Sequence, residues 1–164
     1  MNNDKLMELL DKQALHEVVC RYCRAVDRSD GELFLSCYHP DAHDEHGPYA
    51  GSPTKMLAAL QAKGGPMAPG AITVQHAISN ELFDVQGDVA YGEIYFETRR
   101  TGSNGELLFS IGRYVDRYEK RNGEWRIAYR RCVMEYARKG TNAAAFPQGS
   151  RDRTDPSYER RKRG

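Results

Sequence analysis

The residues best suited to chemistry in this chain are an aspartate and a histidine that each stand on an apolar face. Asp27 ends the segment VVCRYCRAVD, four residues after Cys23 and at the edge of a stripe of apolar side chains. A carboxylate at that position is desolvated and faces the negative end of a helix, so it needs a partner. A histidine or arginine from elsewhere in the fold would supply one. Otherwise Asp27 is a solvated residue at the rim of the core, or it caps the following turn.

His76 is the best candidate for that partner. It lies in the middle of TVQHAIS, where alternation places Ile72, Val74 and Ile78 on the same side. An imidazole among aliphatic side chains needs a hydrogen-bond partner, which a purely structural histidine also finds. In a His–carboxylate dyad, the carboxylate fixes the tautomer and stabilises the imidazolium when the ring takes up a proton. Both interpretations of His76 remain open on pattern alone.

Two further patterns resemble metal or redox motifs. The segment HPDAHDEH, residues 39–46, is rich in histidine and aspartate but has no helical i, i+4 pair, so the sequence predicts a solvated polar loop. Cys20 and Cys23 form a C-x-x-C pair inside a helical pattern, without a second pair of zinc ligands. The four cysteines are therefore expected to be free thiols, and no metal site is expected. His16 lies off the apolar helix face and is expected at the surface.

The elements that must position these side chains change character near residue 72. Residues 15–26 carry apolar side chains at helical spacing, and SDGE (29–32) predicts a second helix capped by Ser29. Residues 54–63 predict a third helix. Four long runs then follow, joined by QGD, TGSNG and RNGE, which predict an antiparallel meander.

Helices followed by an antiparallel sheet predict an α+β domain, in which the helices pack on one sheet face. Long twisted strands curl, and a curled sheet closed by helices makes a cone with an internal pocket. Residues 1–138 are expected to form this single domain. The basic segment 139–164 is expected to be a flap, an arm on a neighbouring subunit or a disordered terminus.

Alternation alone does not decide which faces of the last two strands meet the pocket. Arg130 lies on the opposite face from Trp125 and Tyr129, and Ser110 and Tyr114 share one face of the preceding strand. An exposed sheet face that carries Trp125 and Tyr129 predicts a homo-oligomer, either a dimer or a trimer.

Composition limits the classes of function. The chain has 164 residues, 40% of them hydrophobic and 29% charged, with a net charge of +1. This charge favours neither a nucleic-acid nor a membrane partner. No apolar run is long enough to span a membrane and the first residues do not look like a secretory signal, so a cytoplasmic location is expected. No glycine-rich nucleotide motif occurs, and no cofactor is expected.

Several segments together resemble a known family. They are ALHEVVCRYCRAVDRSDGELFLSCYHPDA, GPYAGSP, TVQHAISN, SIGRYVDRYEKRNGEWRIAYRR and GSRDRTDPSY. They look like the SnoaL-like proteins of the nuclear transport factor 2-like superfamily. That group includes scytalone dehydratase, hexachlorocyclohexane dehydrochlorinase and the bile-acid 7α-dehydratases. The resemblance covers about residues 6–158 and implies the same α+β cone.

The resemblance also implies roles for particular residues. Asp27 and His76 fall on the positions of the His–Asp dyad of the dehydratase and dehydrochlorinase members. Tyr22 matches a polar position that lines the pocket one turn before the aspartate, and Arg130 matches an arginine that helps the leaving group depart. The resemblance further implies that Tyr114 and Ser110 point into the cone and bind substrate.

The function implied by this resemblance is that of a lyase without a cofactor. Its substrate would be a small hydrophobic ring compound such as a steroid or polyketide, and loss of water would be its reaction. The alternatives are an isomerase or cyclase on the same fold, a non-catalytic ligand-binding domain, and a small scaffold subunit of a ring-hydroxylating dioxygenase. A scaffold does not need Asp27 and His76 to face each other in an open pocket, so the dyad discriminates between these classes.

Overall fold

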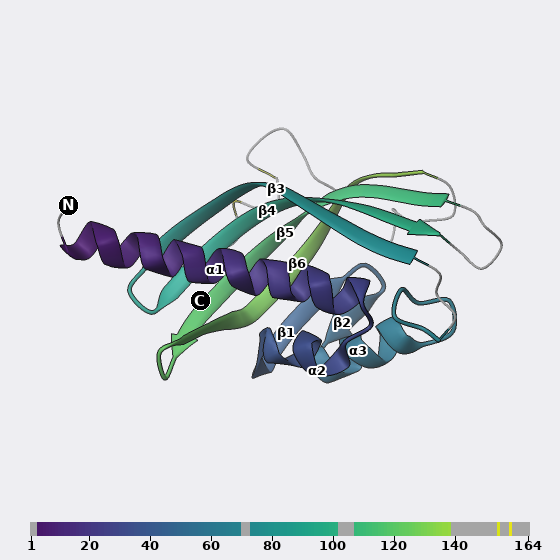
Figure 1. Cartoon of the computed structure of the whole chain (residues 1–164), viewed down its shortest axis with the longest axis horizontal. Helices are drawn as coiled ribbons and strands as arrows, with labels where there is room; N and C mark the ends of the chain where they lie inside the picture. The colour runs from purple at the N-terminus through teal and green to yellow at the C-terminus, as the bar shows by residue number, and fades with distance from the viewer. Residues whose placement is uncertain (1–2, 70–72, 102–106, 139–153, 155–157, 159–164) are drawn as a thin grey trace.

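A computed structural model describes residues 3–69, 73–101, 107–138, 154 and 158 (Figure 1). Helices come first and long strands follow, which confirms the α+β class. The elements in chain order are α1 (Asn3–Asp27), α2 (Gly31–Ser36), β1 (Tyr38–His46), β2 (Tyr49–Gly51), α3 (Pro53–Gln61), β3 (Thr73–Gln86), β4 (Val89–Thr101), β5 (Leu107–Arg121) and β6 (Glu124–Arg138). Apart from Thr154 and Tyr158, the basic segment 139–164 lies outside the described residues. Within the described ranges, no helix is both long and apolar enough to cross a membrane.

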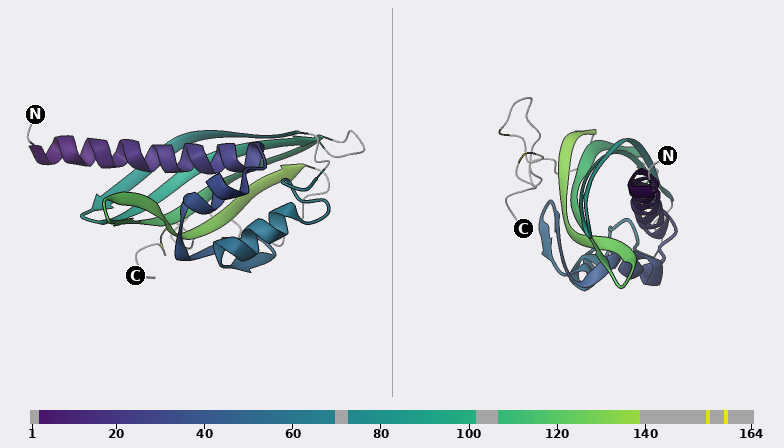
Figure 2. Two further views of the ribbon diagram at one scale, coloured as in Figure 1. Left: turned by 60° about the horizontal axis from the view of Figure 1, so that its bottom comes forward. Right: turned by 90° about the vertical axis from the view of Figure 1, so that its left-hand side faces the viewer.

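The six strands of the described residues form one sheet, in the order β2-β1-β6-β5-β4-β3. Strands β3 to β6 form the expected antiparallel meander. Strand β1 then adds to β6 in parallel, and β2 pairs antiparallel with β1. The end-on view in Figure 2 shows the sheet curving strongly around its concave side, with α1 lying along one open flank. The sheet is therefore curved and unclosed, and only one strand pair in it is parallel.

The prediction of a polar loop over residues 39–46 was wrong. This segment is strand β1, in which Ala42 and Asp44 are buried while Asp41 and His43 are exposed. Its partner β6 begins almost eighty residues later, with Tyr38 opposite Ile127 and Glu45 opposite Arg131. A parallel pairing across that separation leaves no hairpin signal in the sequence.

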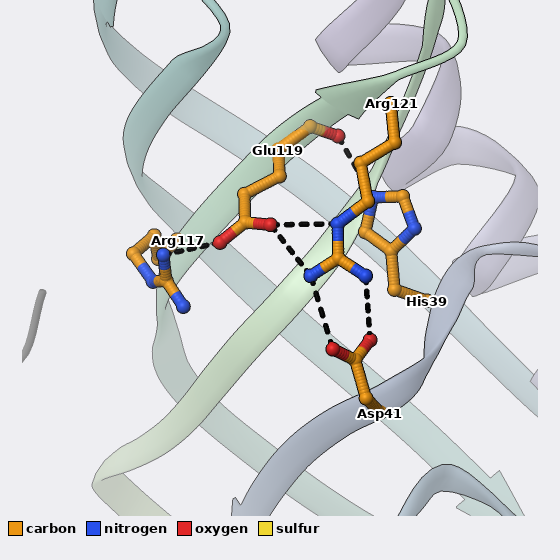
Figure 3. Close-up of polar contacts among 5 residues, drawn as sticks. All are labelled: His39, Asp41, Arg117, Glu119 and Arg121. Carbon is orange, nitrogen blue, oxygen red and sulfur yellow. Dashed lines mark hydrogen bonds and ion pairs between the residues drawn. The ribbon is translucent and has the colours of Figure 1, made fainter.

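Polar contacts fasten the start of β1 to the end of β5 (Figure 3). The Arg121 guanidinium donates to both oxygens of Asp41, at 2.7 and 3.2 Å, and its Nε donates to Glu119 at 2.8 Å. Arg117 pairs with the other oxygen of Glu119. The His39 ring Nε2 lies 2.9 Å from the Glu119 carbonyl oxygen and donates to it. His39 and Asp41 thus stabilise the contact between β1 and β5.

A β-bulge in β6 changes which side chains face the interior. Tyr118 pairs with Ile127 but Arg117 pairs with Tyr129, so Ala128 is an extra residue on β6. The bulge turns Trp125 and Arg130 to the same, buried side, although strict alternation separates them. Trp125 is only 3% exposed, and its indole N–H donates to Asp11 of α1 at 2.8 Å. The expectation of an exposed face carrying Trp125 was therefore wrong.

The turn between α1 and α2 differs from the predicted capping box. Ser29 adopts a left-handed conformation with φ of 53°, which reverses the chain after α1. Asp30 is the N-cap instead, and its side chain accepts a hydrogen bond from the Leu33 N–H at 2.9 Å. This turn ends α1 at Asp27, with its last apolar face against the sheet.

Candidate active site

Asp27 and His76 form the dyad at the centre of the site. The His76 ring Nδ1 lies 2.6 Å from Asp27 Oδ1, and the His76 backbone N–H donates to both carboxylate oxygens at 3.1 and 3.0 Å. β3 is an edge strand, so the backbone N–H that points away from β4 would otherwise lack a strand partner. The carboxylate at the end of α1 therefore accepts hydrogen bonds from both the backbone N–H and the ring N–H of His76. These hydrogen bonds also offset the free-energy cost of removing the carboxylate from water.

This contact assigns the ring tautomer. Because an ionised carboxylate only accepts hydrogen bonds, Nδ1 carries the proton and Nε2 carries the lone pair. The His76 side chain is 8% exposed, and it lines a pocket with a volume of about 150 Å³. The dyad can therefore accept a proton from a molecule held in the pocket.

The pocket has apolar walls with a set of polar side chains among them. Its apolar lining comes from the helices, the sheet and the turn after α3: Val26, Leu60, Pro66, Val74, Phe96, Leu108 and Met134. The polar lining residues are Tyr22, His46, His76, Thr98, Arg100, Ser110 and Tyr114. Such a combination suits a mostly apolar molecule with a few polar groups.

Three of the polar residues form a row across neighbouring strands. His76 on β3 pairs with Thr98 on β4, and Thr98 pairs with Ser110 on β5. Side chains that are directly opposite on neighbouring strands lie about 5 Å apart at Cβ, so the Thr98 hydroxyl stands next to the imidazole and Ser110 lies one strand further along the wall. Ser110 is where the resemblance implies it to be. Thr98 was missed, and only the register of β4 against β3 identifies it.

Tyr22 and Tyr114 both line the pocket, and Arg130 lies behind them. Their rings are 5.5 Å apart, and the Arg130 guanidinium carbon lies 4.1 Å from the Tyr22 ring centroid and 4.0 Å from that of Tyr114. Arg130 is fully buried and is not among the side chains that line the pocket. Its Nε and Nη2 donate to the two oxygens of Asp116 at 2.9 and 2.6 Å. The structure thus brings the tyrosines to the pocket surface but not the arginine.

Burial determines the state of these tyrosines. Desolvation raises the pKa of both Tyr22 and Tyr114, and the positive charge of Arg130 offsets only part of that rise. Both phenols are protonated at neutral pH as a result. A protonated phenol at the pocket wall can donate a hydrogen bond to an oxygen that gains negative charge.

His46 is a further functional candidate that sequence reasoning missed. It ends β1, lines the pocket and forms an ion pair with the buried Asp44, with 3.5 Å between Nδ1 and Oδ1. Burial alone lowers the pKa of His46, but interactions with Cys132 and Asp44 outweigh that effect and raise the pKa to about 10. His46 is therefore a cation at neutral pH. The segment HPDAHDEH shows no alternation of apolar with polar residues, so the sequence carries no clear signal for the placement of His46.

The remaining histidines and the cysteines are not among the residues that line the pocket. His43 stacks on Tyr129, with 6.2 Å between ring centroids, and the His16 Nδ1 lies 2.6 Å from Glu81 Oε2 at a side-chain exposure of 42%. None of the four cysteines forms a disulfide in the structure. The described residues contain no group of three or more His, Cys, Asp or Glu side chains placed to hold a metal ion.

Comparison with known proteins places this geometry in context. The model of the SnoaL-like domain matches residues 7–131. A putative scytalone dehydratase from Novosphingobium aromaticivorans superposes with a TM-score of 0.78 at 17% identity, over 88% of this chain and 97% of that one. Hexachlorocyclohexane dehydrochlorinase LinA-type3 from Novosphingobium barchaimii gives 0.70 at 18% identity, over 84% and 96% of the two chains.

A third solved structure extends the comparison to the wider superfamily. A nuclear transport factor 2-like superfamily protein from Salmonella enterica gives a TM-score of 0.67 at 19% identity, over 80% of this chain and 94% of that one. At these identities the likeness concerns the fold. The search of curated protein sequences found no match.

Proposed function

Starting from the fact that the chain belongs to the SnoaL-like family, we propose that it is a lyase that removes water from a small ring compound. The observation that carries the proposal is the orientation of the dyad. Asp27 holds the His76 ring so that the basic Nε2 remains for a ligand in a pocket with mostly apolar walls. The similarity in fold to dehydratase and dehydrochlorinase structures supports an elimination over other proton transfers.

The first half of the reaction breaks a C–H bond. His76 Nε2 takes a proton from a carbon next to a carbonyl group, and Asp27 stabilises the imidazolium that forms. The electron pair left on carbon begins the new C=C double bond. Thr98, which adjoins His76 in the cross-strand row, is placed to hydrogen-bond the carbonyl oxygen as it gains charge, and Ser110 lies one strand further along the same wall. A positioned base of this kind contributes roughly 10²–10⁴-fold in rate.

The second half releases the hydroxyl group. As the double bond forms, the C–O bond breaks, and the His46 imidazolium gives its proton so that water departs instead of hydroxide. Tyr22 and Tyr114 donate hydrogen bonds at the same wall. His76 afterwards returns its proton to solvent and His46 regains one. Each step uses side chains of the chain itself, so the proposed reaction requires no cofactor.

Arg130 takes a different part from the one that the resemblance implies. It lies behind Tyr22 and Tyr114 and contacts both ring faces, so we assign it as a positioning residue. Its charge lowers the cost of any negative charge that develops at the two phenols. Asp116 fixes the guanidinium plane through two parallel hydrogen bonds.

We further propose the setting in which the enzyme works. Free thiols at all four cysteines suit the reducing cytoplasm. Large side chains on the sheet remain exposed, including Tyr95 at 39% and Tyr136 at 52%, which supports a homodimer or homotrimer. Sedimentation at micromolar protein concentration tests this oligomeric state, and a monomer there would contradict the proposed dimer or trimer.

A screen of β-hydroxy ketones on one- and two-ring scaffolds tests the function. Loss of water produces a conjugated ketone, which is followed by absorbance and by a mass lower by one water. Wild-type turnover that His76→Gln abolishes would support the lyase. A shift of the double bond without loss of mass would identify an isomerase instead. Binding of these compounds without any conversion would favour the ligand-binding or scaffold alternative.

A further inference from the structure

Arg100 occupies the outer layer of the pocket, next to the row that contains the base. On β4 it pairs with Val74 of β3 and with Leu108 of β5, whereas Thr98 pairs with His76 and Ser110. Residues two apart on a strand share a face and lie roughly 6–7 Å apart. Arg100 therefore stands about one aromatic ring's width outward from the His76 row, and it lines the same pocket.

The polar partners of Arg100 leave its charge uncompensated. Its Nη1 donates to the Gly64 carbonyl oxygen at 3.3 Å, which is a neutral acceptor. No carboxylate of a described residue forms an ion pair with it, whereas its neighbour Arg99 pairs with Glu97 at 3.2 Å. A partly buried guanidinium retains N–H donors in a fork that matches a carboxylate.

The charged side chains that line the pocket are all cationic. Among the described residues that line it there is no aspartate or glutamate, while Arg100 and His46 are both cationic. The two carboxylates next to the pocket already have partners, since Asp27 accepts from His76 and Asp44 pairs with His46. A cationic ligand would meet repulsion there. An anion would be attracted to Arg100, and the low dielectric of an apolar pocket strengthens that attraction.

We propose that the substrates are ring-containing carboxylic acids, with the carboxylate on Arg100 and the ring between the apolar walls beside His76. The substrate part of this inference rests on the proposed lyase function, but acid binding at Arg100 does not. The strand spacing separates the carboxylate from the reacting carbon by about one ring. Arg100 would then choose which end of the molecule enters first, which fixes the carbon that meets His76.

The test compares an acid with its neutral amide. Calorimetry measures the binding of 2-naphthoate and 2-naphthamide to the wild type and to Arg100→Gln, Arg100→Lys and Arg99→Gln. Arg99→Gln is the matched control because it removes a neighbouring arginine whose side chain is 51% exposed and paired with Glu97. We expect Arg100→Gln to weaken 2-naphthoate about 10- to 100-fold, the loss that a charged hydrogen bond implies, and to leave 2-naphthamide within about twofold.

The remaining outcomes are decisive in either direction. Partial retention of 2-naphthoate affinity by Arg100→Lys, with Arg99→Gln unchanged, supports the assignment. Equal affinity of the wild type for acid and amide overturns it, as does equal loss in the two glutamine variants or no binding of the acid at about 10 mM. Acid-selective binding together with no turnover of β-hydroxy ketones that also carry a carboxylate on the ring would refute the lyase while leaving the acid site in place.

Discussion

The carboxylate of Asp27 accepts hydrogen bonds from two groups of one residue, the backbone N–H and the ring Nδ1–H of His76. The first contact fixes where β3 lies against the end of α1. The second fixes which nitrogen of the ring is basic. One side chain thus couples the packing of the helix on the sheet edge to the orientation of the proposed base.

Replacing Asp27 by Asn should change the tautomer of His76 with little change in shape. An amide cannot stabilise an imidazolium, and its NH₂ group can donate to Nδ1, which would place the ring proton on Nε2. Nitrogen-15 NMR of the labelled imidazole should show an Nδ1–H ring in the wild type and a mixed or reversed tautomer in Asp27→Asn. Elimination activity should fall about 10²–10⁴-fold. An unchanged His76 spectrum would contradict the role assigned to Asp27.

The His46–Asp44 pair predicts how stability depends on pH. Interactions that outweigh burial hold the pKa of His46 at about 10 in the folded state, against an ordinary value of 6.5. As the pH rises, the unfolded chain therefore releases this proton before the folded chain does. The contribution of protonated His46 to the free energy of unfolding is complete below pH 6.5 and is lost as the pH rises toward 10. The groups that face His46 are Asp44, Cys132 and the ring of Tyr114. Interactions with His46 outweigh the effect of burial and lower the pKa of Asp44, so Asp44 stays ionised across this range.

Urea unfolding between pH 6.5 and 9 measures this effect, and His46→Gln is the comparison. The wild type should lose free energy of unfolding across this range, and the variant should show a flatter profile. Burial raises the pKa of Cys23 to about 12 and of Cys37 to about 11. Ionisation of these thiols in the unfolded chain therefore lowers the free energy of unfolding only above their ordinary pKa of 9.0. Parallel profiles for the two proteins would show that His46 is not held as a cation.

The buried Arg130–Asp116 pair should be costly to break from one side. Arg130→Leu leaves Asp116, which is 1% exposed, without its main partner. We expect a loss of about 3–5 kcal/mol in the free energy of unfolding, much of which the double variant with Asp116→Leu should restore. The surface pair of Arg126 and Glu124 is the control, and Arg126→Leu should cost less than about 1 kcal/mol. Equal costs at the two arginines would contradict the buried-pair description.

Gly112 is the glycine on which the pocket wall depends. A Cβ at this position would lie 2.4 Å from the Val133 carbonyl oxygen and 2.6 Å from the Phe96 ring, which stacks on Tyr114. Gly112→Ala should therefore destabilise the protein by about 1–3 kcal/mol and weaken ligand binding, because Phe96 must move. Gly31→Ala is the matched control, since its Cβ would meet only the movable ends of Leu57 at 3.2 Å and Gln61 at 3.4 Å. Similar melting temperatures for the two variants would contradict this description of the wall.

The dyad could be predicted from the sequence because its signals are local. Asp27 follows a clear helical stripe and His76 lies in a clear alternating run, so each residue could be placed on a face. The resemblance to the SnoaL-like family then supported the pairing of Asp27 with His76. The meander was accessible for the same reason, since its turns are short and contain Asn-Gly.

Features that depend on contacts distant in sequence could not be predicted. The parallel pairing of β1 with β6 is one, and it carries His46 into the pocket. The extra residue Ala128 is another: it turns Trp125 toward the same side as Arg130, and no period-2 pattern reveals such a shift. Thr98 and Arg100 gain meaning only from the register of β4 against its neighbours.

The most direct test of the account is the kcat/KM of His76→Gln for a hydroxy ketone that the wild type dehydrates, measured beside His16→Gln. His16 is the matched histidine because it also pairs with a carboxylate, Glu81, but does not line the pocket that contains His76. If His76 is the base, its variant should lose about 10²–10⁴-fold in kcat/KM while His16→Gln remains near wild type. A wild-type kcat/KM in a folded His76→Gln protein would contradict the central claim.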